Sequence, residues 1–332
     1  MRSNSAPPGP GARPPAASRC ALVLVAVSLA GCVGIEKAVI APHYQRAELD
    51  PARGEALLDL PYLDGAGTHP EKHRLDLFRP RGPGWPTLVF VHGGSLENGD
   101  KALRRGGYDL YRNIGRFYAS RGVAVALVNY RLQPEVRWPQ QADDVAAATR
   151  WVLDNVESMG GDGRVFLAGH SAGAWLAAHA VLDQDRAARY DLHPEEIAGI
   201  ISVSGSGYDL TDRDTWEMFG REKVWARRFE DGESGEDWRT RASVVPLVDK
   251  AAPPFLLVYT KKEWEALARQ NRLLRAALED AGVEARLVEL ETGSHRRMVL
   301  ALSRGDGRLS ATVLDFVAGP PAAPAGAASG PE

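Results

Sequence analysis

The sequence is poor in cysteine, has no surplus of either charge and lacks a long hydrophobic run. Its 332 residues include two cysteines, Cys20 and Cys32, and no cysteine or histidine spacing typical of a zinc site. Forty Lys and Arg residues against 43 Asp and Glu give a formal net charge of −3 without a basic cluster, which argues against a nucleic-acid partner. The apolar run at residues 21–30 is far shorter than the roughly 20 residues of a membrane-spanning helix.

The N-terminal 31 residues have the pattern of a secretory signal peptide. Arginines precede the apolar run, which is followed by the sequence Leu29-Ala30-Gly31-Cys32. These four residues resemble a bacterial lipobox, which implies cleavage before Cys32, lipid attachment to its thiol and a membrane-anchored protein of the cell envelope. In that resemblance Val33 favours the outer membrane, with the protein facing the periplasm. The alternative is an ordinary secretory signal or an N-terminal anchor.

Cleavage of this signal has two further consequences. Cys20 is removed, so the mature chain cannot form an internal disulfide and its stability must come from a hydrophobic core. Three arginines and no acids are removed, so the formal net charge changes from −3 to −6. A composition of 44% hydrophobic and 25% charged residues is ordinary for a globular protein and allows a large core.

The rest of the chain divides into a tether at residues 32–55, one α/β domain at 56–317 and a disordered tail of Ala, Pro and Gly at 318–332. Residues 57–63 and 72–78 are predicted as an edge hairpin. Predicted strands and helices then alternate, which favours a mainly parallel sheet with helices on both faces. The predicted strands are 87–91, 123–130, 165–168, 197–204, 255–259 and 285–290, and the helices are 108–120, 141–156, 174–184, 264–281 and 310–317.

Residues 206–248 interrupt this alternation. They carry aromatic side chains among many charges, without a regular period. We interpret them as a short helical cap over the site that forms part of the substrate pocket. A surface loop with packed aromatic residues is the alternative.

A nucleophile elbow is predicted at Gly169-His170-Ser171-Ala172-Gly173, where a buried strand turns sharply into a helix. Glycines on both sides of the serine remove side chains that would collide with the neighbouring strand and helix. Ser171 is therefore the candidate nucleophile, and the amide of Ala172 at the helix start is a candidate oxyanion donor.

A glycine pair follows the strand at 87–91, in the sequence His92-Gly93-Gly94-Ser95. Without side chains, the backbone amides of Gly93 and Gly94 can approach a ligand, and we predict them as the second and third oxyanion donors. A plain Gly-Gly turn is the alternative.

Ser171 needs a base, and that base needs an acid to fix its tautomer. His295 lies after the last central strand, where the base is expected. Glu263 is the first acid after the strand at 255–259 and is the predicted third member, with Glu265 and Asp209 as alternatives. His170 is expected to face away from the nucleophile.

Together with Gly99-Asp100-Lys101 and Asn129-Tyr130-Arg131-Leu132, these motifs resemble the α/β-hydrolase superfamily. Within it, the chain is similar to the carboxylesterases of the hormone-sensitive-lipase and feruloyl-esterase-like group, which includes relatives of kynurenine formamidase. The chain departs from such relatives in having HGGS after the strand and in lacking the Gly and Asp that usually follow the penultimate strand.

The expected activity is hydrolysis of small or water-soluble esters through an acyl-enzyme, without a metal or organic cofactor. One alternative is an amidase or kynurenine-formamidase-like hydrolase with the same catalytic residues. Another is a catalytically silent lipoprotein that uses the fold for binding. The sequence gives no indication of the oligomeric state.

Overall fold

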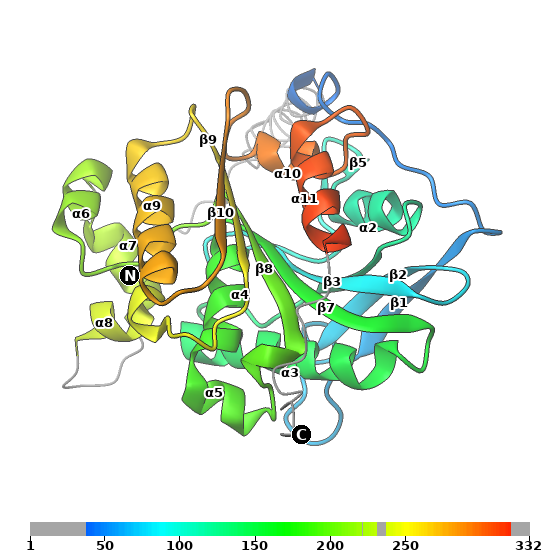
Figure 1. Ribbon diagram of the computed structural model, residues 1–332, viewed down its shortest axis with the longest axis horizontal. Coiled ribbons are helices and arrows are strands. Elements are labelled where there is room, and N and C mark those ends of the chain that lie inside the picture. The colour runs from blue at the N-terminus through cyan, green and yellow to red at the C-terminus, as the bar shows by residue number, and fades with distance from the viewer. Residues whose placement is uncertain (1–37, 221, 231–236, 320–332) are drawn as a thin grey trace, which may run out of the picture.

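An eight-stranded sheet forms the centre of the computed structural model, which describes residues 38–220, 222–230 and 237–319. The strand order is β1-β2-β6-β3-β7-β8-β9-β10. Strand β2 pairs antiparallel with both β1 and β6, and the six strands from β6 to β10 in this order are parallel. Figure 1 shows helices packed on both sides of the sheet, and this confirms the predicted fold class.

The elements have the following bounds. The strands of the main sheet are β1 (Gly54–Pro61), β2 (Arg74–Pro80), β3 (Trp85–Val91), β6 (Ala124–Val128), β7 (Gly161–His170), β8 (Ile197–Val203), β9 (Phe255–Thr260) and β10 (Ala285–Leu290), and β4 (Arg104–Arg105) pairs with β5 (Tyr108–Asp109). The helices are α2 (Tyr111–Ala119), α3 (Trp138–Val156), α4 (Ala172–Leu182), α5 (Gln184–Arg189), α6 (Arg213–Phe219), α7 (Glu222–Phe229), α8 (Trp238–Ala242), α9 (Glu265–Asp280), α10 (Arg297–Ala301) and α11 (Arg308–Ala318), with short 3-10 turns at Pro194–Glu196 and Val245–Leu247.

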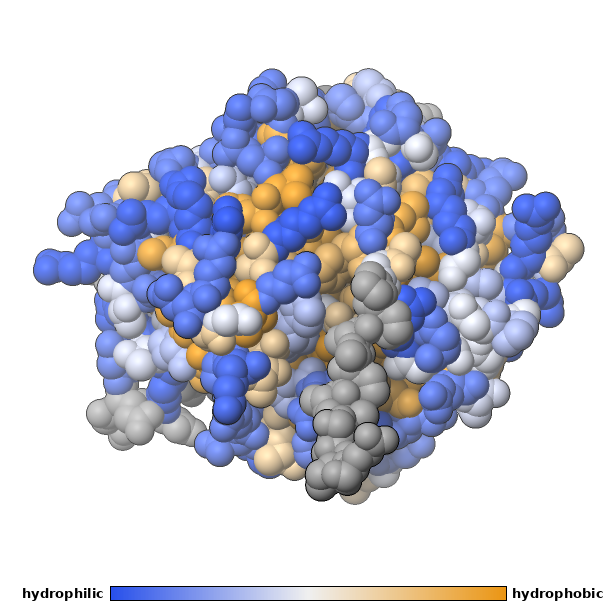
Figure 2. Space-filling model, in the orientation of Figure 1, coloured by the Kyte–Doolittle hydropathy of each residue, from blue (hydrophilic) through white to orange (hydrophobic). Residues whose placement is uncertain are grey.

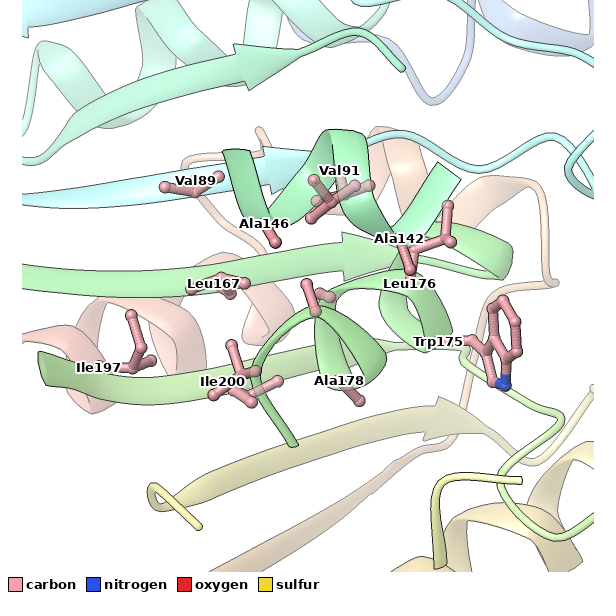
Figure 3. Packing of buried hydrophobic residues seen from close by; sticks show 14 of the residues in the cluster. Val89, Val91, Ala142, Ala146, Leu167, Trp175, Leu176, Ala178, Ile197 and Ile200 are labelled. Atoms are coloured by element: carbon pink, nitrogen blue, oxygen red, sulfur yellow. The ribbon is translucent and has the colours of Figure 1, made fainter. Parts of the chain in front are cut away.

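The central strands are buried on both faces, and alternate residues enter two separate cores. Val89 and Leu167 face α3, α4 and α9, whereas Phe90 and Phe166 face α2, α10 and α11. Figure 3 shows the first core, in which side chains of β3, β7 and β8 meet small residues such as Ala146. Two buried faces hold the carboxyl ends of the parallel strands in fixed positions, where loops can present a site.

Two predicted helix starts are wrong by three residues, and the other three differ by one or two. The helix expected from residue 108 begins at Tyr111, because Tyr108 and Asp109 pair with β4 instead. Helix α3 begins at Trp138, three residues before its predicted start at 141, and includes Pro139 in its first turn. Proline is tolerated there because amides of the first turn have no partner within the helix.

The tether and the cap lie only partly within the described residues. From residue 38 onward the predicted tether packs on the domain: the amide of Ala47 donates to Asn113 on α2, and the side chain of Gln45 accepts from the amide of Gly305. The predicted cap at 206–248 contains the short helices α6, α7 and α8. The predicted signal peptide, Cys32 and the tail from residue 320 lie outside the described residues.

Hydrophilic side chains cover most of the face in Figure 2, and hydrophobic ones gather toward its middle. Within the described ranges, no helix combines the length and the hydrophobicity needed to cross a bilayer.

Candidate active site

Ser171 lies at a tight turn between β7 and α4, with φ 57° and ψ −126°. A positive φ is costly for any residue with a side chain, so the surrounding packing must impose this conformation. A Cβ on Gly169 would lie 2.3 Å from the carbonyl carbon of Gly173, and a Cβ on Gly173 would lie 2.2 Å from the carbonyl oxygen of Val91. Only glycines fit at these two positions, because the turn is pressed against both its own helix and strand β3.

The imidazole of His295 is in direct contact with this serine. Its Nε2 lies 2.8 Å from Ser171 Oγ, although the two residues are 124 positions apart in the sequence. His295 lies on the loop between β10 and α10, and its side chain is 36% exposed. An imidazole nitrogen at this distance can accept the hydroxyl proton.

Glu263 approaches the other nitrogen of the same imidazole. Its Oε1 lies 3.3 Å from His295 Nδ1, and its side chain is fully buried. The second oxygen, Oε2, has no hydrogen-bond donor in the described part of the chain. A carboxylate in this position favours the tautomer with the proton on Nδ1, which leaves Nε2 free to accept the proton of Ser171.

The two alternative acids lie elsewhere. Glu265 forms an ion pair with Arg272 on the exposed side of α9. Asp209 accepts hydrogen bonds from the amide and hydroxyl of Thr211. Neither carboxylate contacts His295 among the described interactions, so the structure brings together Ser171, His295 and Glu263.

The sequence suggested that His170 faces away from the nucleophile, but its ring lies beside that of His295. Its Nε2 donates to the backbone carbonyl of His295 at 2.8 Å, and the two rings lie 4.9 Å apart. Burial, together with the nearby His295, lowers the pKa of His170 to about 3, so the ring is neutral at physiological pH. His170 therefore anchors the loop that carries His295, a role that nothing in the local sequence signals.

The glycine pair after β3 lies beside the nucleophile. A Cβ on Gly93 would lie 2.7 Å from the His170 carbonyl oxygen and 3.2 Å from Ser171 Cβ, so this position requires glycine. Gly94 has φ +138°. None of the described backbone hydrogen bonds uses the amide of Gly93 or of Gly94, so both remain candidate oxyanion donors.

Ser95, which sequence reasoning did not assign to the site, follows Gly94 and lines the cavity with Ser171 and Ala172. Its φ of 56° is also unusual for a residue with a side chain. The available signal was position alone, because Ser95 is the fourth residue of the HGGS sequence and directly follows the glycine pair.

The loop is held from behind by His92. Its ring stacks on Tyr130 with centroids 4.3 Å apart, and Tyr130 donates its hydroxyl to the His92 carbonyl at 2.9 Å. Burial lowers the pKa of His92 to about 4. A Cβ on Gly99 would lie 2.3 Å from His92 Nδ1, so the glycine allows the loop to close over this ring.

A cavity of about 440 Å³ opens above Ser171. The following residues line it: Ser95, Leu96, Ser171, Ala172, Trp175, Ser206, Arg228, Phe229, Lys262, Glu263, Trp264, Leu267, Ser294, His295 and Arg296. The indole of Trp138 and the amide of Gln133 donate to the carbonyls of Phe229 and Arg228, at 2.7 and 2.8 Å. The cap wall of the cavity is therefore fixed to the body of the domain. No group of three or more His, Cys, Asp or Glu side chains is placed to hold a metal ion among the described residues.

Comparison with known proteins gives consistent results. A family described as having the alpha/beta hydrolase fold matches residues 88–299. Esterase LipC of Mycobacterium tuberculosis is 32% identical over 196 residues, covering 56% of this chain and 46% of LipC. Esterase LipQ of the same organism is 28% identical, covering 83% of this chain and 69% of LipQ. An Arabidopsis thaliana isoprenylcysteine alpha-carbonyl methylesterase is 30% identical, covering 69% and 55%.

The chain therefore spans about half to two thirds of the length of these curated relatives. Among solved structures, esterase B from Lactobacillus rhamnosis has a TM-score of 0.64 at 23% identity, covering 90% of this chain and 93% of that one. A carbohydrate esterase from gut microbiota has a TM-score of 0.64 at 18% identity, covering 82% and 98%. At these identities the structural similarity establishes the fold.

Proposed function

The chain belongs to the α/β-hydrolase fold family, and from this premise we propose that it is a serine carboxylesterase acting on small or water-soluble esters. The observation that carries the proposal is the 2.8 Å contact between Ser171 Oγ and His295 Nε2, at the floor of a cavity. A serine hydroxyl is a weak nucleophile unless a neighbouring base takes its proton, and His295 is placed to do so.

The first step forms an acyl-enzyme. His295 takes the hydroxyl proton while Ser171 Oγ bonds to the ester carbonyl carbon, and the carbonyl oxygen becomes an oxyanion. We assign the oxyanion to the amides of Gly93, Gly94 and Ala172, with the amide of Ser95, which also lines the cavity, as a further candidate donor. Amide donors fixed in advance stabilise the developing charge more than water does.

The tetrahedral intermediate then breaks its bond to the alcohol oxygen. His295 gives its proton to that oxygen, so the alcohol leaves neutral and Ser171 carries the acyl group. In the second half, water loses a proton to His295 and attacks the acyl carbon, which releases the carboxylic acid and regenerates the hydroxyl of Ser171. Glu263 stabilises the imidazolium in both halves.

Ester hydrolysis is preferred to amide hydrolysis because the relatives named above are all described as esterases or methylesterases. The same names give no support to a silent binding protein. We also propose that Cys32 anchors the enzyme by a lipid in the bacterial outer membrane, facing the periplasm, because the lipobox resemblance at residues 29–32 is the only targeting signal that we identify in the sequence.

The test is hydrolysis of p-nitrophenyl acetate by the wild-type protein, Ser171→Ala and His295→Ala. We expect each substitution to lower kcat by about 10⁴- to 10⁶-fold, because nucleophile and base act as one unit. His193→Ala, which alters an exposed histidine away from the cavity, is the matched control and should keep wild-type activity.

A fluorophosphonate probe gives a second measurement that does not depend on the choice of ester. It should label the wild-type protein and leave Ser171→Ala unlabelled. Near-wild-type turnover by folded Ser171→Ala would disprove the assignment of the nucleophile.

A further inference from the structure

The charged side chains around the cavity are unequal in sign. Three cationic residues line it, Arg228, Lys262 and Arg296, and the only acid is Glu263. The side chain of Glu263 is fully buried against His295, so it presents no charge to a ligand. The accessible charge in the described lining is therefore positive, although the whole chain has a formal net charge of −3.

Two of these three cations have no counter-ion among the described residues. Arg228 pairs with Glu97 at 2.9 Å. Lys262 and Arg296 are exposed and form no ion pair within the described part of the chain. The neighbouring Lys261 differs, because its ammonium group lies 2.7 Å from Glu291. Lys262 and Arg296 are thus cations that a ligand can engage without displacing a protein carboxylate.

These two cations belong to the loops that carry the catalytic base and acid. Lys262 directly precedes Glu263 after β9, and Arg296 directly follows His295 after β10. Strands β9 and β10 are parallel neighbours, so their carboxyl ends lie side by side. Much of the apolar lining comes from other elements: Leu96 from the loop after β3, Trp175 from α4 and Phe229 from α7. Trp264 and Leu267, which follow Glu263, add apolar surface on the side of the β9 loop.

The mechanism indicates which half of the ester these loops face. His295 must protonate the departing alcohol oxygen, so the alcohol part of the substrate leaves across the imidazole. The loops on either side of this imidazole carry Lys262 and Arg296. An anionic group on the alcohol part would therefore lie nearest to these two cations.

We propose, on the basis of the proposed function, that the substrates are esters whose alcohol part carries an anionic group such as a carboxylate or phosphate, which Lys262 and Arg296 bind. Because both cations are exposed to water, their combined effect is moderate, about tenfold in kcat/KM. It should also weaken with salt, because the Debye length falls from about 30 Å at 0.01 M to about 3 Å at 1 M.

The experiment compares 4-acetoxybenzoate, whose leaving group is anionic, with 4-acetoxybenzamide, its neutral analogue of similar shape. Release of acetate is measured with the wild-type protein and with the double variant Lys262→Gln/Arg296→Gln. The matched control is Lys261→Gln/Arg297→Gln, which removes two adjacent positive charges that lie outside the cavity lining.

We expect the wild-type protein and the control to prefer the anionic ester by about tenfold at low salt, and the double variant to lose this preference. The proposal would be overturned if the ratio of kcat/KM for the anionic ester to that for the neutral ester were at or below one in the wild-type protein. It would also be overturned if this ratio were unchanged in the double variant. A third ester, phenyl hydrogen succinate, carries its anion on the acyl part. If the double variant lowered kcat/KM for this ester as much as for 4-acetoxybenzoate, the assignment of the two cations to the alcohol side would be refuted.

The two proposals fail in different ways. If the wild-type protein hydrolyses neither acetoxy ester, the esterase function is wrong and this inference falls with it. If it hydrolyses the neutral ester as fast as the anionic one, the esterase function stands and the inference is wrong.

Discussion

The side chains of His295 and Glu263 differ sharply in their access to water. The imidazole is 36% exposed, whereas the carboxylate is fully buried and, in the described part of the chain, has one hydrogen-bond partner, Nδ1 of His295 at 3.3 Å. A buried carboxylate is costly unless it is paired, so its position is favourable mainly through the imidazole. This difference supports the proposed roles, in which His295 transfers the proton and Glu263 orients the imidazole.

Replacing Glu263 with Gln should lower kcat by about 10²- to 10⁴-fold, because the amide removes the negative charge that stabilises the imidazolium. The measurement is steady-state hydrolysis of p-nitrophenyl acetate as a function of pH. Glu265→Gln and Asp209→Asn are the matched controls, and both should remain within a few-fold of the wild-type protein. A large loss in either control with little loss in Glu263→Gln would reassign the acid.

At the scale of the elements, the turn from β7 into α4 depends on the absence of side chains. Gly173 is pressed against the end of β3, where an added methyl group would lie 2.2 Å from the Val91 carbonyl oxygen. The Val91 carbonyl and the Cα of Gly173 are both part of the backbone, so this collision could be removed only if α4 or β3 moved. The turn that presents Ser171 therefore has no room for a larger residue at Gly173.

Gly173→Ala should lower the free energy of unfolding by about 1–3 kcal/mol through overpacking. It should also lower kcat by a larger factor than it changes KM, because Ser171 is displaced. Thermal unfolding and steady-state kinetics measure the two effects. Gly305→Ala is a control for adding a methyl group without a clash, since the nearest atom to the added methyl group is 3.4 Å away. Wild-type kinetics in folded Gly173→Ala would show that the turn has room to adjust.

At the scale of the whole molecule, three buried histidines make the fold sensitive to acid. Burial lowers the pKa of His92 to about 4, and of His170 and His179 to about 3. In the unfolded chain a histidine titrates near 6.5. As the pH falls below about 6.5, the unfolded state therefore binds protons that the folded state does not, and stability is lost down to the folded pKa values.

His179→Gln should reduce this acid sensitivity, because glutamine can still donate to the Ala242 carbonyl that His179 contacts at 3.0 Å but does not titrate. The expected change in the pH dependence of unfolding is at most about 1.4 kcal/mol per pH unit between pH 6.5 and 4. Denaturant unfolding at a series of pH values measures it. His193→Gln, at an exposed position, should leave the slope unchanged, and an unchanged slope in His179→Gln would contradict the explanation.

The proposed lipid anchor at Cys32 concerns the whole molecule in its cell. Cys32→Ser should release the protein from the membrane fraction, because the thiol that would receive the lipid is gone. Cell fractionation and the mass of the mature N-terminal peptide measure this. Cys20→Ser is the control, since that residue precedes the proposed cleavage point, and an unlipidated N-terminal peptide in the wild-type protein would refute the anchor.

Local patterns in the sequence were sufficient for much of this structure. The apolar runs and the helix periods predicted the central strands and most helices, because burial on both faces leaves a signal within a few residues. The elbow at Ser171 was equally local, since the collisions that require Gly169 and Gly173 involve the turn itself and the strand beside it. For the same reason, the sequence by itself determined the fold class and the candidate nucleophile.

Tertiary structure alone decided which distant groups meet. The approach of Glu263 to His295, which neither Glu265 nor Asp209 makes, and the contact of His170 with the His295 loop depend on loop paths and side-chain directions. Ser171 and His295 are 124 residues apart and meet only because their strands end at the same edge of the sheet. Such contacts depend on how the elements pack against one another, and the residues next to each group in the sequence do not determine that packing.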